Sequence, residues 1–148
     1  YHPKIILAGR ELNDNMGNYV ALELINKMRE QKIDIKGAKI LIMGLTFKEN
    51  CPDIRNSGVN NVINKLNQFE CDLHLQDPFV HKEEIKKIFN IYPNSKPIPN
   101  TYDAVLIAVA HDKFKKLGLS YIKSLCKKNH VIFDLKNIFN SNEVDLKL

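Results

Sequence analysis

The chain has 148 residues, of which 44% are hydrophobic and 26% charged, and its formal net charge is +5. These values are ordinary for a soluble globular protein and allow one domain with its own core. No apolar run is long enough to span a bilayer and no signal-peptide pattern is present, so the sequence predicts no membrane segment. The lysines are scattered rather than gathered in one stripe, which argues against a nucleic-acid partner.

The cysteines Cys51, Cys71 and Cys126 are odd in number and do not share the spacing of metal ligands. Reduced thiols in the cytoplasm are the simplest interpretation, and no metal site is expected. Because the chain begins at Tyr1 rather than at Met, we expect it to be a piece of a longer protein.

The first predicted element is a single long helix at residues 4–30. Its apolar side chains recur at helical spacing: Ile5, Leu12, Met16, Tyr19, Val20, Ile25 and Met28. Gly9 and Gly17 weaken the helix but leave room for another helix to approach closely. A helix of this length before the first strand is not expected to be used fully by its own domain.

The segment from Ala38 to Ser57 predicts a strand, a loop and the start of a helix. Ile40 to Met43 is a short apolar run, typical of a strand buried on both faces, and Gly44 ends it. Ser57 can cap a helix whose apolar positions recur at helical spacing, namely Val59, Val62, Ile63 and Leu66. The segment is therefore the start of a βαβ unit.

Three side chains of the intervening loop suit a ligand. Phe47 offers an aromatic face, and Lys48 and Arg55 offer two cations, a combination that suits a ring carrying phosphates. Ligands of open α/β sheets bind at the carboxyl ends of the strands, where this loop lies. The closely spaced glycines of a dinucleotide fingerprint are absent, because only Gly44 is in place. Side-chain cations must therefore carry any phosphate contact, in a Rossmann-like layout with a different ligand geometry.

The rest of the chain continues the alternation of strands and helices. The predicted strands are 71–75, 103–110 and 130–133, the predicted helices are 81–89 and 120–128, and the last residues can add a short edge strand. This alternation predicts an α/β fold in which helices cover both faces of a parallel sheet. In such a sheet the loop at 44–57, His111 and Lys136 all lie at one edge.

Three other residues of this edge have more than one interpretation. Asp77 can bind a ribose hydroxyl or be an ordinary loop aspartate before Pro78, and both interpretations stay open. His111 can be a ligand group at a strand end, although a polar loop histidine is favoured. Cys51 lies near two cations that can activate a thiolate, but no histidine base is adjacent in sequence, so a structural or incidental role is favoured.

The loop and the first helix also carry a family resemblance. The run Gly44-Leu45-Thr46-Phe47-Lys48, followed by Cys51-Pro52-Asp53-Ile54-Arg55-Asn56-Ser57, resembles the C-terminal domain of the UDP-glucose/GDP-mannose dehydrogenase family. The opening His2-Pro3-Lys4-Ile5-Ile6-Leu7-Ala8-Gly9-Arg10, with Asn13-Asp14, is similar to the central helix of that family. Within the family, these motifs are most similar to those of bacterial UDP-N-acetylhexosamine 6-dehydrogenases of surface-polysaccharide synthesis, of the Vi-antigen and UDP-N-acetylgalactosamine types.

The resemblance implies an enzyme larger than this chain. That enzyme would oxidise a UDP-hexose or UDP-N-acetylhexosamine at C6 to the uronic acid, using two NAD in succession through a cysteine thiohemiacetal and thioester. Residues 34–148 would be its UDP-sugar-binding Rossmann-like domain, and residues 1–33 its connecting and dimerisation helix. An N-terminal domain that precedes Tyr1 would bind most of the NAD. That domain would also carry the catalytic cysteine and lysine. No catalytic residue is therefore expected here, and the chain alone is expected to be inactive.

The resemblance also implies roles for four side chains. Phe47 and Lys48 would contact the UDP-sugar, and Arg55 would reach the NAD held by the other domain. Lys136 falls where the family usually has an arginine that contacts the sugar, and lysine keeps the charge but loses the bidentate fork. The implied partners are the UDP-sugar, the N-terminal domain of the same chain, and a second copy bound through the helix at 4–30.

Two other classes of protein compete with this interpretation. A non-catalytic nucleotide-binding module of Rossmann-like fold would bind a ligand without belonging to an enzyme, and the gene sequence before Tyr1 separates it from the dehydrogenase. A flavodoxin-like receiver domain needs acidic residues at the exit of the first strand and a phospho-acceptor aspartate at the third. The exits here carry Lys48 and His111-Asp112, so the receiver domain is disfavoured.

Overall fold

Helices and strands alternate along the chain, as the sequence predicts. The computed structural model describes residues 3–55, 57–93 and 96–148. Its elements are α1 (Lys4–Glu30), β1 (Lys39–Met43), α2 (Val59–Gln68), β2 (Asp72–Gln76), α3 (Lys82–Phe89), β3 (Tyr102–Ile107), α4 (Asp112–Leu125), β4 (Cys126–Asp134), the 3-10 turn η1 (Ser141–Glu143) and β5 (Leu146–Lys147). Within the described residues the strands form one five-stranded sheet in the order β2-β1-β3-β4-β5, and all its pairings are parallel.

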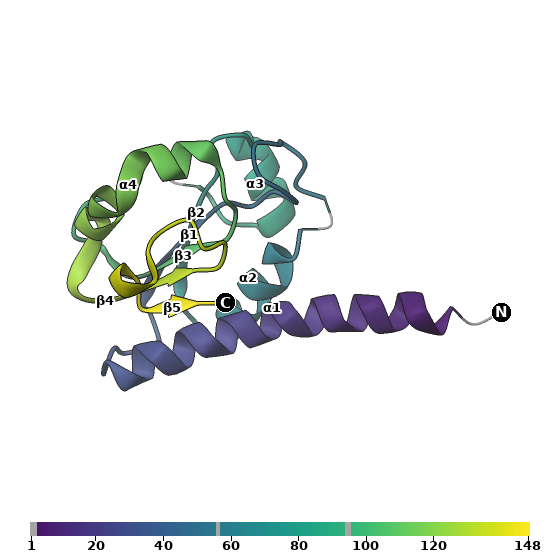
Figure 1. Cartoon of the computed structure of the whole chain (residues 1–148), viewed down its shortest axis with the longest axis horizontal. Coiled ribbons are helices and arrows are strands. Elements are labelled where there is room, and N and C mark those ends of the chain that lie inside the picture. The colour runs from purple at the N-terminus through teal and green to yellow at the C-terminus, as the bar shows by residue number, and fades with distance from the viewer. Residues whose placement is uncertain (1–2, 56, 94–95) are drawn as a thin grey trace.

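A hydrophobic core lies on each face of the sheet, because successive side chains of a strand point to opposite faces. In β1, Ile40 and Ile42 join the core that α1 and α2 cover, whereas Leu41 and Met43 join the core that α4 covers. Figure 1 shows these layers, with α1 and α2 on one side of the sheet and α4 on the other. Each fully buried large apolar side chain stabilises the fold by roughly 1.5–3 kcal/mol. Helices thus cover both faces of the sheet, as predicted.

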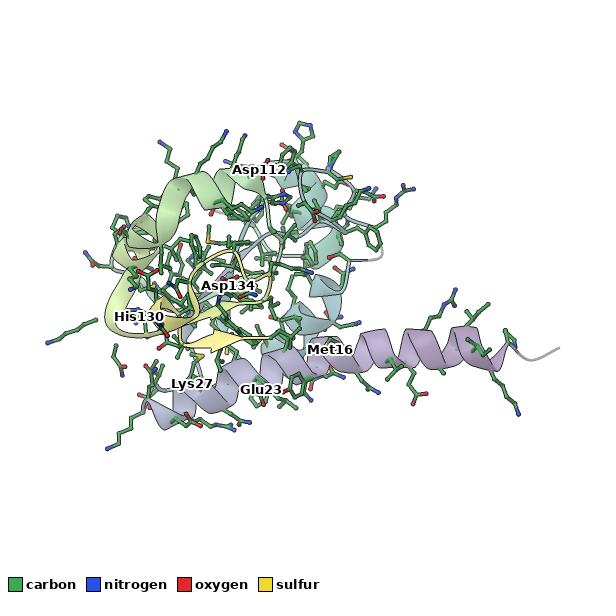
Figure 2. All side chains as sticks on the ribbon, viewed as in Figure 1. Met16, Glu23, Lys27, Asp112, His130 and Asp134 are labelled. Atoms are coloured by element: carbon green, nitrogen blue, oxygen red, sulfur yellow. The ribbon has the colours of Figure 1, made fainter. Side chains whose placement is uncertain are left out.

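The long helix α1 divides into two halves with different surroundings. In the second half, Leu24 and Met28 are fully buried, whereas in the first half Ile5 and Leu12 expose 89% and 70% of their surface. Figure 1 shows the first half projecting beyond the rest of the chain, and Figure 2 places Met16 near the point where the helix leaves the domain. Although α1 spans 27 residues, neither it nor another described helix is apolar enough to cross a membrane.

Gly17 marks the place where α1 meets α2. A Cβ atom at this position would lie 2.6 Å from the Cβ of Asn61, so glycine is what lets the two helices approach so closely. The close helix contact that the sequence allowed at either glycine is therefore made at Gly17. A Cβ atom at Gly9 would meet nothing within 4 Å.

The start of α4 corrects the sequence-based prediction. The sequence predicted a helix at 120–128, but α4 already begins at Asp112, with His111 at its N-cap position. Gly118, with a φ of 80°, kinks the helix. The kink divides α4 into two short helical segments. The apolar pattern of the first segment is too short to be recognised as helical from the sequence.

The start of β4 also differs from the prediction, which placed the strand at 130–133. The strand begins at Cys126, which pairs with Tyr102 of β3 across a register shift. Lys127 is exposed, and its Nζ donates to both carboxylate oxygens of Asp103 at 3.1 Å. Pairing with β3 therefore extends the strand through polar residues, where tertiary contacts outweigh the local apolar pattern.

Candidate functional site

A cleft of about 1050 Å³ opens at the carboxyl ends of β1, β3 and β4. Its walls come from the β1–α2 loop, the first turn of α2, the segments after β3 and β4, and the first half and middle of α1. From β1 the chain turns to one side of the sheet and from β3 to the other, so the cleft lies where the strand order reverses. Ligands of doubly wound sheets bind at such switch points. The volume is at the large end of the range for small-molecule sites.

The structure brings together the three side chains that the sequence analysis assigned to the substrate. Phe47 and Lys48 reach the cleft from the β1–α2 loop, and Lys136 reaches it from the segment after β4. The ring of Phe47 is largely exposed and lines the cleft, so its face is open to a ligand there. Neither ammonium group has a hydrogen bond or an ion pair with the residues that the structure describes. Both are therefore available to an anionic ligand.

Arg10 of α1 is a further cleft residue, and the sequence analysis assigned it no role. Among the described residues that line the cleft, Arg10, Lys48 and Lys136 are basic and one side chain, Glu49, is acidic. This balance favours an anionic ligand. The one signal in the sequence was the family-like motif around Arg10, because nothing local shows that the first helix passes the loop at 44–57.

Arg55 lies outside the set of cleft residues. Its guanidinium donates to both carboxylate oxygens of Asp53, from Nε at 3.1 Å and from Nη2 at 3.2 Å. The hydrogen bonds with Arg55 lower the pKa of Asp53, and the same pairing raises the pKa of Arg55. The two predicted functions therefore separate in space, with the predicted substrate residues in the cleft and the predicted cofactor residue on the exposed outer part of the loop.

The β1–α2 loop is held by its own backbone and by small polar side chains. Gly44 has a φ of +100°, and a Cβ atom there would lie 2.5 Å from the Cβ of Val109, so the turn requires glycine. The Phe47 N–H donates to the carbonyl of Asp53 at 2.8 Å. Ser57 accepts from the Val59 N–H at 3.3 Å, so it caps α2 from one residue before the N-cap position.

Asp77 and His111 form a buried pair beneath this loop. Asp77 Oδ2 accepts from the Leu45 N–H at 2.8 Å and lies 2.9 Å from His111 Nε2, and Asp77 Oδ1 accepts from the Phe79 N–H at 2.8 Å. Of the two interpretations of Asp77, the structure favours a loop-shaping aspartate over a ribose ligand. His111 lies in the segment between β3 and α4, and its side chain is fully buried, which the sequence did not indicate. Its partners come from two distant segments, which no local pattern reveals.

The cysteines offer no reactive group in the cleft. Burial raises the pKa of the Cys71 thiol to about 11 and that of Cys126 to about 12, so both thiols stay protonated at neutral pH. Cys51 is partly buried and does not line the cleft. Among the described residues no group of three or more His, Cys, Asp and Glu side chains is arranged to hold a metal ion.

The sheet order and the basic cleft define a doubly wound α/β domain whose cleft at the switch point suits an anionic ligand. Residues 41–141 match the UDP-binding domain of the UDP-glucose/GDP-mannose dehydrogenase family, and the chain belongs to this family. The matched range includes the β1–α2 loop, β3 and Lys136. It contains every residue that lines the cleft except those of α1 and Leu148.

Named relatives agree with this family. The whole chain is 44% identical to part of a UDP-N-acetyl-D-glucosamine 6-dehydrogenase from Salmonella typhi and 43% identical to part of one from Pseudomonas aeruginosa. It spans 35% of the length of each relative. A solved structure of the UDP-N-acetyl-mannosamine dehydrogenase Cap5O from S. aureus superimposes with a TM-score of 0.72 at 28% identity, over 97% of this chain and 32% of that one.

Proposed function

We propose that this chain is the UDP-sugar-binding domain of an NAD-dependent 6-dehydrogenase, which acts in the cytoplasm in surface-polysaccharide synthesis. The substrate would be a UDP-hexose or, as the names of two relatives support, a UDP-N-acetylhexosamine. The observation that carries the proposal is the cleft at the switch point, where Phe47, Lys48 and Lys136 converge.

The cleft side chains can divide the contacts to such a ligand between them. Lys48 is a point charge that suits the diphosphate, and charge-assisted hydrogen bonds of this kind are stronger than neutral ones. Phe47 offers an exposed ring face, and Lys136 can donate to sugar hydroxyls. Because lysine lacks the planar fork of arginine, the contact from Lys136 would be less directional. Arg10 adds a third positive charge from α1.

NAD, bound mainly by a preceding N-terminal domain, would accept the hydride from C6 of the sugar. The described residues fit a contact at the edge of NAD rather than a cradle for its pyrophosphate. In the turn after β1 only Gly44 is present where a dinucleotide fingerprint has three closely spaced glycines. Arg55 is exposed and its pairing with Asp53 is of a kind that adds little stability, so its guanidinium can turn towards an approaching NAD.

The test is substrate oxidation by the full-length protein that contains this chain. NADH formation is expected with at least one of UDP-glucose, UDP-N-acetylglucosamine, UDP-N-acetylgalactosamine and UDP-N-acetylmannosamine, with two NADH formed for each uronic acid. GDP-mannose serves as the control for the nucleotide. A full-length protein that binds these UDP-sugars and oxidises none would instead favour the non-catalytic nucleotide-binding module.

We also propose that α1 joins two copies of the protein. The large apolar side chains of its first half are between 45% and 89% exposed among the described residues, and a row of exposed apolar side chains on one helix is typical of an interface. Leu12→Glu and Met16→Glu are each expected to convert a dimer to a monomer, measured by sedimentation at high micromolar concentration. Asn26→Glu, an exposed position in the second half of the same helix, is the control and should stay dimeric. A wild-type monomer would refute the proposal.

A further inference from the structure

We infer that His111 is the positioning residue for Lys48: its ring fixes the β1–α2 loop so that Lys48 is presented to the cleft. The inference rests on the proposed function, because it concerns the same ligand site, and it assigns a role to a histidine that does not itself line the cleft. The ring of His111 is fully buried at the N-cap position of α4 and packs against Phe79 and Phe114, with ring centroids 4.8 and 5.3 Å away.

The hydrogen bonds of His111 determine where its proton lies. The Asn50 N–H donates to Nδ1 at 3.0 Å, and a backbone N–H can only donate, so Nδ1 carries no proton. Nε2 lies 2.9 Å from Asp77 Oδ2, which already accepts the N–H of Leu45. Nε2 is therefore the protonated nitrogen, and the ring is a neutral tautomer with one acceptor and one donor, both in use.

These two contacts join segments far apart in the chain. Through Nε2, His111 contacts Asp77, the residue that follows β2. Through Nδ1, it holds the backbone of Asn50, a residue with a left-handed φ of 57°. The Asn50 side chain also accepts from the Asp112 N–H at 3.0 Å. The loop is thus anchored to the start of α4 two residues after Lys48.

A second anchor lies two residues before Lys48. Thr46 is buried, and its hydroxyl donates to the Lys48 carbonyl at 2.9 Å. The same hydroxyl oxygen lies 3.3 Å from His111 Nε2 and can accept part of that N–H. The backbone of Lys48 is therefore held from both sides by groups that meet at His111. Its side chain, which has no partner among the described residues, depends on this backbone for its direction.

Two substitutions of His111 each preserve one of the two hydrogen bonds that its ring makes. His111→Asn places an oxygen near the position of Nδ1, so it keeps the acceptor for the Asn50 N–H. His111→Gln places an N–H near the position of Nε2, so it keeps the donor to Asp77 and loses the loop contact. Each variant loses one hydrogen bond of the ring, so comparable falls in unfolding temperature are expected. A purely structural role for His111 predicts no further difference between them.

The first experiment measures UDP binding by calorimetry in the full-length protein. His111→Gln is expected to raise the Kd about three- to tenfold, the loss that one hydrogen bond typically causes, whereas His111→Asn should stay within about twofold. Added to Lys48→Ala, His111→Gln should have no further effect, because it acts through Lys48. Equal Kd values for the two His111 variants, or effects that add to that of Lys48→Ala, would overturn the inference.

A second measurement needs no ligand. Tryptic cleavage after Lys48 reports whether the loop is held, and it should be faster in His111→Gln than in both wild type and His111→Asn. If wild type fails to bind UDP, the proposed function fails, while the cleavage rates still decide whether His111 holds the loop. If neither His111 variant folds, Thr46→Val takes their place, since it removes the hydroxyl bond to the Lys48 carbonyl at nearly constant volume. Unchanged cleavage and UDP affinity in Thr46→Val would then refute the inference.

Discussion

Lys48→Ala in the full-length enzyme is expected to weaken UDP-sugar binding about ten- to hundredfold, the cost of one lost charge-assisted contact. The ammonium group lines the cleft and has no partner among the described residues, so its removal costs ligand binding rather than folding. The measurement is the Kd of the UDP-sugar by calorimetry, with the KM for NAD determined beside it. The KM for NAD should change little.

Arg55→Ala is expected to do the reverse, raising the KM for NAD while leaving the Kd of the UDP-sugar nearly unchanged. Arg55 is exposed and paired with Asp53 outside the cleft. Lys128→Ala, an exposed lysine in the first part of β4, is the matched control and should change neither value. Equal effects on both substrates from Lys48→Ala, or from Arg55→Ala, would contradict this division of roles.

The positions of the predicted site residues in the fold follow from the local sequence pattern around each of them. A buried strand that ends at Gly44 must turn at the edge of the sheet, so Phe47 and Lys48 follow at its carboxyl end. Lys136 follows the apolar strand at 130–133 by the same reasoning. Parallel pairing of β1, β3 and β4 then brings these side chains to one edge, as the alternation of elements predicted.

The residues that the sequence did not predict depend on contacts between distant segments. Arg10 lines the cleft from α1, which Gly17 lets lie close against α2. The role of His111 follows from partners 34 residues before it at Asp77 and 61 residues before it at Asn50. Periodicity describes one element at a time, so it cannot reveal a buried polar group whose partners lie on other elements. The two halves of α1 show the same limit, because their apolar spacing is alike and only packing distinguishes them.

Residues 1–148 alone are expected to form no NADH from any UDP-sugar, because two requirements of the reaction are missing from the described residues. Hydride transfer needs a nicotinamide held against the sugar, and the closely spaced glycines that would hold the pyrophosphate of NAD are absent from the turn after β1. The covalent step needs a thiolate with a base, and both nitrogens of His111 already have partners.

The assay that checks this expectation follows NADH formation by the isolated chain at high protein concentration, with UDP-glucose and both UDP-N-acetylglucosamine and UDP-N-acetylgalactosamine. Weak UDP binding without turnover is the expected phenotype, since under the proposed function a preceding domain would complete the wall around the ligand. Cys51→Ser is the control, because Cys51 is partly accessible and lies in the β1–α2 loop. Turnover that Cys51→Ser abolishes would contradict the expectation and would make Cys51 the nucleophile of a self-sufficient enzyme.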